Sequence, residues 1–349
     1  MLRFIVICIG IFGALGTLLA QSESELCWSK LPDLPNRLGV AGPFAGTHNG
    51  VLIVAGGANF PDSPPWEGGT KVWYDSVFVL ERPESNWKEV GRLPRPLGYG
   101  VSLSTDRGIV CIGGSDFMHH HADCFLLRWE SGELKTQWLP SLPKPCANFS
   151  GAMIGSTIYI AGGIETPTAT SAMKTFWSLD VNDRQATWKE LEPWPGPARM
   201  LAVTAVLDNS FYLASGTDLT SDEQGKPVRK YLRDVYCYRP MHGWKPLADM
   251  PRPAVAAPTP APVLAESSFL ILSGDDGSLV HFQPMSAHPG FPKSILAYEM
   301  ASDCWKELGE VQAGHVTTSI VRWNGGFVIP SGEVRPGVRS PVVWSLKTN

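Results

Sequence analysis

VLIVAGG at residues 51–57 is an apolar run that ends on a small residue and two glycines. The same pattern recurs along the 349-residue chain, each time followed by a variable loop, a second apolar run and a tryptophan. The six copies are VLIVAGG (51–57), GIVCIGG (108–114), TIYIAGG (157–163), FYLASG (211–216), FLILSG (269–274) and GFVIPSG (326–332). Six copies of one unit indicate a repeat architecture instead of two or three unrelated domains.

A tryptophan precedes each glycine closure at a nearly constant distance. The separation to the last glycine of the next closure is 25 to 30 residues in all six repeats. The tryptophans are Trp28, Trp87, Trp138, Trp188, Trp244 and Trp305. Loop length varies mainly between the glycines and the following tryptophan, as expected when each repeat is one supersecondary unit with insertions on one side.

The composition indicates an all-β chain. Glycine (35) and proline (30) are frequent, and strong helical patterns are absent, while short runs of β-branched and aromatic residues alternate with turn residues. A repeat of roughly 50 residues with four short strands, glycines after the second and an aromatic residue on the fourth resembles a kelch-type propeller blade. The resemblance implies a six-bladed kelch-type β-propeller.

The two ends of the repeat region complement each other. The first tryptophan strand, residues 26–28, has no three strands before it, and the stretches 316–323, 326–332 and 341–346 have no fourth strand after them. We therefore expect the N-terminal strand to complete the last blade, because this pairing hides sheet edges that would otherwise be exposed. The propeller is then one domain, residues 22–349.

Residues 1–20 are expected to be a signal peptide. Arg3 precedes an apolar segment that ends at Ala20, before the polar stretch QSESE. An uncleaved anchor is the alternative. We predict an exported protein, periplasmic or secreted, whose remaining six cysteines are compatible with disulfides of undetermined pairing. Several cysteines lie within apolar runs, where an inert buried thiol is expected, and we predict no catalytic cysteine.

Charge and histidine content exclude several classes of site. The net charge is −4 and no run of like charges occurs, so we expect no nucleic-acid partner and no membrane contact beyond the signal segment. His119, His120 and His121 invite a metal interpretation. Consecutive strand residues point to opposite faces, so at most two of them can face one ion, and nothing nearby completes a ligand set. We predict no metal site and place the start of a strand at His121.

One face of the ring is expected to carry the ligand site. Because strand direction alternates in a meander, the loops after the glycines and the Leu-Pro turns share a face. Loops that converge on a central pore commonly bind ligands. This face collects Arg37, Arg95, Arg199, Arg252, Glu333, Arg335 and Arg339. Each arginine is either a structural donor to loop carbonyls or a ligand contact, and Glu333 is either a catalytic residue or an ion-pair partner of a neighbouring arginine.

Three motifs carry a resemblance to one family. They are GVAGPFAG (39–46), GGANFP (56–61) and the signature Gly-Glu-x-x-Pro-Gly-x-Arg (332–339). Together they resemble the N-acetylneuraminate epimerases, the sialic acid mutarotases, in their cyclically permuted branch. In the usual order the blade with the third motif directly precedes the blade with the first. Here these motifs lie at opposite ends of the chain, and a closed ring tolerates such a change of break point.

The resemblance implies a cofactor-independent isomerase that interconverts the anomers of N-acetylneuraminate or a related sugar acid. It implies that Glu333 is the proton acceptor and that Arg339 holds the sugar carboxylate, with Arg199 as a second anchor. The alternative is a non-catalytic kelch propeller that binds carbohydrate or protein. A glycoside hydrolase would need a second carboxylate about 5 to 9.5 Å from the first, and we expect none in the loops after the glycines.

Overall fold

The apolar runs before the glycines form the second strand of each blade. In the computed structural model, which describes residues 26–348, these strands are buried over nearly their whole length. They are β3 (Val51–Ala55), β9 (Gly108–Ile112), β13 (Thr157–Ala161), β17 (Ser210–Ala214), β23 (Ser268–Leu272) and β27 (Gly326–Pro330). A neighbouring blade covers each of their two faces, so the strands read as continuous apolar runs and not as alternating ones.

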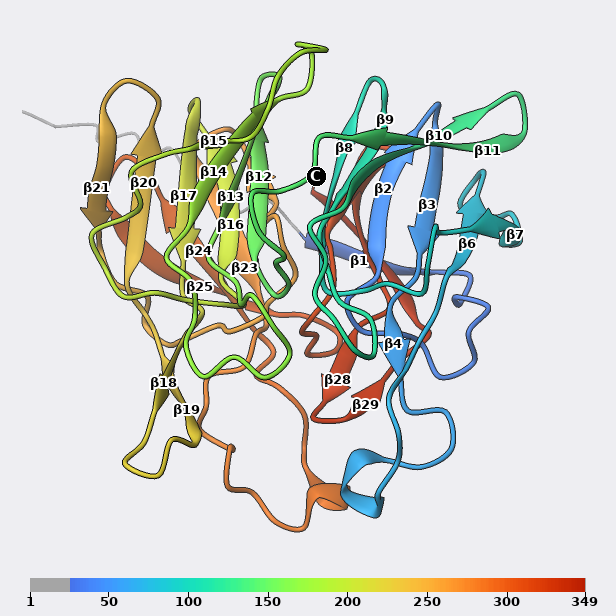
Figure 1. Cartoon of the computed structure of the whole chain (residues 1–349). Coiled ribbons are helices and arrows are strands. Elements are labelled where there is room, and N and C mark those ends of the chain that lie inside the picture. The colour runs from blue at the N-terminus through green and yellow to red at the C-terminus, as the bar shows by residue number, and fades with distance from the viewer. Residues whose placement is uncertain (1–25, 349) are drawn as a thin grey trace, which may run out of the picture.

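Each second strand belongs to a four-stranded antiparallel sheet, and six such sheets surround a central axis (Figure 1). The first strands are β2 (Phe44–His48), β8 (Val101–Thr105), β12 (Ser150–Ile154), β16 (Val203–Leu207), β22 (Val263–Leu264) and β26 (Val321–Trp323). The third strands are β6 (Ser76–Leu80), β10 (Cys124–Glu130), β14 (Phe176–Asp180), β20 (Val235–Arg239), β24 (Ser294–Glu299) and β30 (Val343–Thr348). The fourth strands are β7 (Lys88–Arg92), β11 (Glu133–Leu139), β15 (Lys189–Glu190), β21 (Gly243–Leu247), β25 (Cys304–Glu310) and β1 (Leu26–Leu31). The six-bladed propeller predicted from the repeats is confirmed.

The N-terminal strand closes the ring as expected. β1 pairs antiparallel with β30, with Leu26 opposite Thr348 and Leu31 opposite Val343. The sixth blade is therefore built from both ends of the described chain. This pairing covers the edge of β30 that the blade would otherwise expose.

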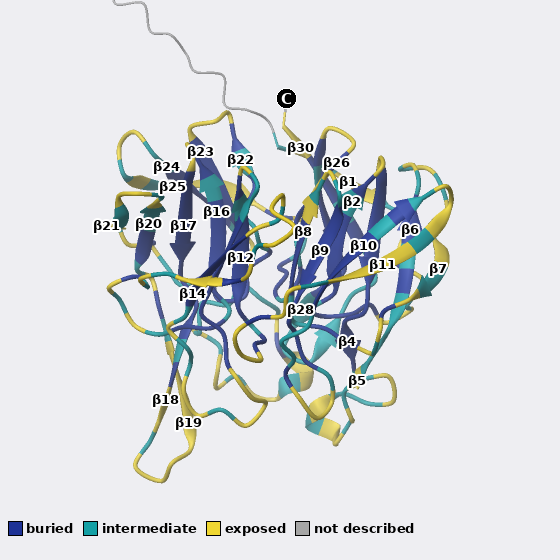
Figure 2. Ribbon diagram, turned by 45° about the horizontal axis from the view of Figure 1, so that its top comes forward, coloured by how far each residue is buried: buried dark blue, intermediate teal, exposed yellow. Residues whose placement is uncertain are grey.

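One apolar cluster fills each interface between neighbouring blades. Between blades 1 and 2, for example, Phe44 and Ile53 pack in one cluster with Phe125. Burial decreases from the inner strands to the outer ones, so that β7, β11 and β25 are largely exposed (Figure 2). The ring is thus held by six separate cores of similar construction, and no single core dominates it.

Four of the six repeated tryptophans connect neighbouring blades at their outer edges. Their indole Nε1 groups donate to backbone carbonyls just after the outer strand of the preceding blade. The bonds are Trp87 to Pro32 (2.8 Å), Trp188 to Pro140 (3.0 Å), Trp244 to Glu192 (2.8 Å) and Trp305 to Ala248 (3.0 Å). The constant spacing of tryptophans in the sequence therefore reflects an inter-blade contact as well as packing.

Six backbone hydrogen bonds form a closed ring around the central axis. One residue from each blade donates its N–H to the carbonyl of its counterpart in the preceding blade, over 2.6 to 2.9 Å. The six are Gly42, Tyr99, Asn148, Leu201, Ala256 and Thr317, and all have positive φ. Five of them are not glycine, so the left-handed conformation has a local cost that the ring of hydrogen bonds offsets.

Three small hairpins project from the face that carries the loops after the glycines, at the bottom of Figure 1. They are β4 (Ala58–Asn59) with β5 (Val72–Trp73), β18 (Thr217–Ser221) with β19 (Pro227–Tyr231), and β28 (Glu333–Arg335) with β29 (Val338–Arg339). Two short 3-10 helices, η1 (Pro65–Glu67) and η2 (Met285–Ala287), lie on the same side. No helix among residues 26–348 is long and apolar enough to cross a membrane, and the expected signal peptide, residues 1–20, lies outside the described residues.

Candidate active site

A cavity of about 610 Å³ opens on the hairpin face and is lined by residues from all six blades. Five members of the hydrogen-bonded ring, from Tyr99 to Thr317, line it, so the ring of backbone bonds forms its floor. A smaller cavity of about 60 Å³ continues along the axis on the other side of that ring. The size of the cavity on the hairpin face is typical of small-molecule sites, about 300 to 1,000 Å³.

A larger hollow, of about 880 Å³, lies on the opposite face of the propeller. It is lined by turns between first and second strands, such as residues 47–50 and 104–107. None of the site residues expected from the sequence lines it. The cavity on the hairpin face is therefore the candidate site.

The hairpin β28–β29 brings Glu333 and Arg339 together. The two residues lie directly opposite each other in the hairpin register, because the turn at Pro336 and Gly337 reverses the chain between them. Glu333 Oε2 lies 3.2 Å from Arg339 Nη2, and Glu333 Oε1 accepts a 2.8 Å hydrogen bond from the Gly337 backbone N–H. The spacing of six residues in the signature is thus the spacing of a cross-strand pair.

Arg339 packs against an aromatic ring and has hydrogen-bond donors without partners. Its guanidinium carbon lies 4.8 Å from the ring centre of Phe60, and its side chain is 4% exposed, compared with 16% for Glu333. The Nε and Nη1 atoms of Arg339 are buried and have no hydrogen-bond partner among the described residues. Buried donors without partners are rare in folded proteins, and a ligand oxygen would satisfy them.

The N-terminal motif packs against the hairpin from the other end of the chain. The Val40 N–H donates to Ser331 Oγ (2.8 Å), and the Gly332 N–H donates to the Val40 carbonyl (3.0 Å). A Cβ on Gly39 would lie 2.2 Å from the carbonyl oxygen of Ser340, so this approach requires glycine. The two motifs at opposite ends of the sequence are therefore neighbours in space.

Asp275 is a second acid in the cavity, and the sequence expectation that no such residue follows the glycines was wrong. Each residue after a closure forms a bridge to the residue that precedes a ring member: Asp275 with Val255, and Glu333 with Val316. Asp275 is thus the blade 5 equivalent of Glu333, and both line the cavity. The signal was present in the sequence, since Ser273-Gly274-Asp275 has the same form as Ser331-Gly332-Glu333.

Both carboxylate oxygens of Asp275 are occupied by donors from the chain. The Tyr231 hydroxyl donates to Oδ2 (2.9 Å) and the Gly277 N–H donates to Oδ1 (2.9 Å). Burial, and secondarily the charge of Asp275, raises the pKa of Tyr231 to about 12. Tyr231 therefore stays protonated at neutral pH and holds Asp275 in place.

Arg199, expected to be a second substrate anchor, lies outside the cavity. Its side chain is fully buried, and its Nη2 lies 2.6 Å from Asp234 Oδ2 while Nη1 donates to the Ser215 carbonyl (2.8 Å). The guanidinium also packs over the rings of Trp194 and Tyr236. The interpretation of Arg199 as a substrate anchor was therefore wrong: its guanidinium binds Asp234 and the Ser215 carbonyl inside the propeller and does not face the cavity.

Two other arginines expected on this face donate to carbonyls of the loops. Arg252 donates to the carbonyls of Ser273 and Ser294, and Arg335 donates to the carbonyl of Ser286. Arg339 is the only one of the six expected arginines that lines the cavity. Arg252 and Arg335 are thus structural donors to loop carbonyls, which is one of the two roles that the sequence left open.

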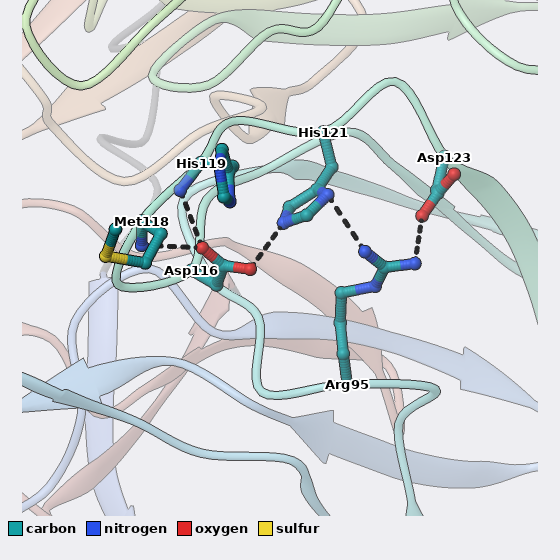
Figure 3. A network of polar contacts seen from close by, with 6 residues as sticks. All are labelled: Arg95, Asp116, Met118, His119, His121 and Asp123. Carbon is teal, nitrogen blue, oxygen red and sulfur yellow. Dashed lines mark hydrogen bonds and ion pairs between the residues drawn. The ribbon is translucent and has the colours of Figure 1, made fainter.

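The three consecutive histidines lie in a loop, and two of them, His119 and His121, take part in a polar network (Figure 3). The strand β10 begins at Cys124, so the expectation of a strand at His121 was wrong. His121 bonds Asp116 Oδ2 through Nε2 (2.7 Å) and Arg95 Nη1 through Nδ1 (3.1 Å), and Arg95 also pairs with Asp123 (2.8 Å). Within residues 26–348 no group of three or more histidine, cysteine, aspartate or glutamate side chains is arranged to hold a metal ion.

Asp116 is the member of this network that lines the cavity. Burial alone would raise its pKa, but hydrogen bonds from the backbone N–H groups of His119 and Met118 and from His121 outweigh this effect. The pKa of Asp116 is therefore lowered. The loop between blades 2 and 3 thus presents a fixed negative charge at the cavity.

Buried thiols behave as the sequence suggested. Burial raises the pKa of Cys124 to about 12 and raises the pKa values of Cys111 and Cys146 well above their ordinary range. The thiolate is the reactive form of cysteine, so the raised pKa values lower the reactivity of these three thiols.

The sequence model of the family described as N-acetylneuraminate epimerase matches residues 17–136 and 139–280, which is more than half of the chain. The chain belongs to the N-acetylneuraminate epimerase family. The matched residues end before the Glu333–Arg339 hairpin, so the roles of these two residues rest on the signature and the geometry.

Members of this family with curated descriptions are similar over part of their length. The N-acetylneuraminate epimerase of Haemophilus influenzae is 26% identical over 227 residues, which cover 58% of either chain. That of Yersinia enterocolitica is 27% identical over 235 residues, covering 60% of this chain and 57% of the relative. The chain thus spans less than two thirds of the relatives' length in these matches. A solved structure, "Structure of YjhT", shares the fold with a TM-score of 0.66 and 14% identity, covering 92% of this chain and 99% of the other.

Proposed function

We propose that the protein is a mutarotase that interconverts the α and β anomers of N-acetylneuraminate or a closely related sugar acid. The observation that carries the proposal is the Glu333–Arg339 pair, which lies across one hairpin at the wall of the central cavity. Membership of the epimerase family supports the substrate class. The pair places a proton acceptor beside a carboxylate-binding guanidinium.

The reaction needs one proton acceptor near the anomeric hydroxyl. Glu333 takes the proton of this hydroxyl, the O–H electron pair forms the carbonyl, and the bond between the anomeric carbon and the ring oxygen breaks. The ring oxygen keeps the electron pair of the broken carbon–oxygen bond and takes a proton from water. After the carbonyl turns its other face to the ring hydroxyl, closure reverses both transfers, and Glu333 returns its proton to the new anomeric oxygen.

The chain's contacts orient Glu333 for this step. The Gly337 N–H and Arg339 each hold one carboxylate oxygen, so the side chain has a defined position before a ligand arrives. Preorganisation of this kind lowers the cost of reaching the reactive geometry. Arg339, with two unpartnered nitrogens, is the group we assign to the carboxylate of the sugar.

NMR spectroscopy of anomer re-equilibration tests the proposal. Freshly dissolved or freshly released N-acetylneuraminate relaxes slowly to its anomer equilibrium, and the parent protein should speed this relaxation. Glu333→Gln should lower the catalysed rate by about 100-fold or more, the range typical of a general base. Glu165→Gln is the matched control, because Glu165 is exposed and does not line the cavity.

Two results would contradict the mutarotase. Equal relaxation rates with and without protein would favour a non-catalytic propeller that binds carbohydrate or protein, and so would a Glu333→Gln variant as fast as the parent. Asp275 is a second carboxylate in the same cavity, and a glycoside hydrolase also uses two carboxylates. The signature with Arg339 contains Glu333 and not Asp275, so we assign Asp275 no proton transfer, and release of the aryl group from an aryl sialoside would overturn that assignment.

We further propose that the protein is exported, to the periplasm or the medium. The support is the basic residue and apolar segment of residues 1–20, followed by a polar stretch. Fractionation of cells that express the full chain, with N-terminal sequencing of the product, would test this. Cytoplasmic product that keeps residues 1–20 would refute it.

A further inference from the structure

Lys71 stands in an aromatic cage at the wall of the same cavity. Its ammonium nitrogen lies 5.7 Å from the ring centre of Phe60, 5.3 Å from that of Trp73 and 5.0 Å from that of Tyr99. All four residues line the cavity. An ammonium within about 6 Å of an aromatic ring is attracted by the ring's negative face. Three rings thus hold this cation in place without neutralising its charge.

The charge balance of the cavity gives Lys71 its significance. The positive charge of Arg339 is largely offset by Glu333, 3.2 Å away, and the Arg339 side chain is only 4% exposed. Asp116 and Asp275 add negative charge to the same cavity. Lys71 and Arg229 are the two further cations of the cavity lining, and neither forms an ion pair with an acid within residues 26–348. Lys71 is the one that shares an aromatic ring, Phe60, with Arg339.

Unsatisfied donors cluster around the same rings. Trp73 Nε1 and Tyr99 Oη are buried and have no hydrogen-bond partner among the described residues, as is true of Arg339 Nε and Nη1. Phe60 contacts both cations, since Arg339 Cζ lies 4.8 Å and Lys71 Nζ lies 5.7 Å from its ring centre. Several donors and two cations share this side of the cavity, and a ligand rich in acceptor oxygens would satisfy them.

We propose that Lys71 is a substrate-binding residue that attracts and anchors the carboxylate of the sugar acid together with Arg339. The proposal rests on the sugar-acid substrate class put forward above. It assigns a division of labour: Arg339 both orients Glu333 and donates to the ligand, whereas Lys71 supplies a positive charge that is not paired with an acid of the chain. Phe60 sets the position of both cations.

Isothermal titration calorimetry with one anionic and one neutral ligand tests the assignment. N-Acetylneuraminate carries the carboxylate, and its methyl ester lacks the charge but keeps the sugar. Lys71→Met should weaken binding of the acid by about tenfold or more and that of the ester by less than about twofold. Lys71→Arg keeps the cation and should recover most of the affinity for the acid. Lys144→Met is the matched control, because Lys144 is exposed and lies outside the cavity.

Several outcomes would count against Lys71. Parent-like binding of the acid by Lys71→Met, or equal loss for acid and ester, would overturn the proposal, the second because it indicates a purely structural role. Loss of acid preference in Arg229→Met instead would move the anchor to the other unassigned cation of the cavity. A parent that binds neither ligand, or shows no preference for the acid, also overturns it. A parent that prefers the acid but does not speed anomer exchange would refute the mutarotase while leaving the anchor supported.

Discussion

Arg199→Met is expected to cost stability without weakening sugar binding. The substitution removes the donors to Asp234 Oδ2 (2.6 Å) and to the Ser215 carbonyl (2.8 Å) from a side chain that is fully buried. Breaking a buried ion pair from one side costs about 3 to 5 kcal/mol. The Asp234 side chain is 22% exposed and keeps the hydrogen bond from the Tyr236 hydroxyl, so we expect the lower end, about 3 kcal/mol.

Urea denaturation followed by tryptophan fluorescence measures this loss of unfolding free energy. Calorimetry on the folded variant should give the parent's affinity for N-acetylneuraminate. The double variant Arg199→Met/Asp234→Asn should recover part of the loss, about 1 kcal/mol or more, because it no longer leaves a carboxylate without its cation. A variant with the stability of the parent but weaker sugar binding would refute the placement of Arg199 outside the site.

Two further predictions concern the walls of the cavity. Gly337→Ala places a side chain at φ 78° and a Cβ 2.5 Å from Pro65 Cγ. We expect a loss of unfolding free energy of about 1 kcal/mol from the backbone and about 1 to 3 kcal/mol from the contact. Anomer exchange followed by NMR should also be slower, and a fully stable, fully active variant would contradict this. The pKa of Asp116 is lowered in the folded state, so its stabilising contribution is present above its unfolded value of about 3.9 and is lost as the pH falls through the folded value. Asp116→Asn should therefore lose less stability than the parent on acidification below about pH 4, as measured by urea denaturation at each pH, and parallel profiles would show that Asp116 does not contribute.

The fold was largely predictable because its signals are local and repeated. Each apolar run before a glycine forms a second strand, and the strand around Trp28 completes the sixth blade. The Glu333–Arg339 pair was also predictable, since a turn with Pro336 and Gly337 brings residues six apart into register. The strand boundary near His121 was not predictable, because hydrogen bonds to Asp116 hold residues 116–121 in a loop and the strand begins only at Cys124.

By itself the sequence determined the number of blades, the closure of the ring by its first strand and the signature that contains Glu333 and Arg339. Only the tertiary structure decided which charges face the cavity. Arg199 and Arg339 both occupy loops of the same face, yet Arg199 is enclosed with Asp234 while Arg339 and Lys71 lie around Phe60. Strand and turn formation depend on neighbours along the chain. The partner of a charged side chain is set by loops from other blades, which no local pattern records.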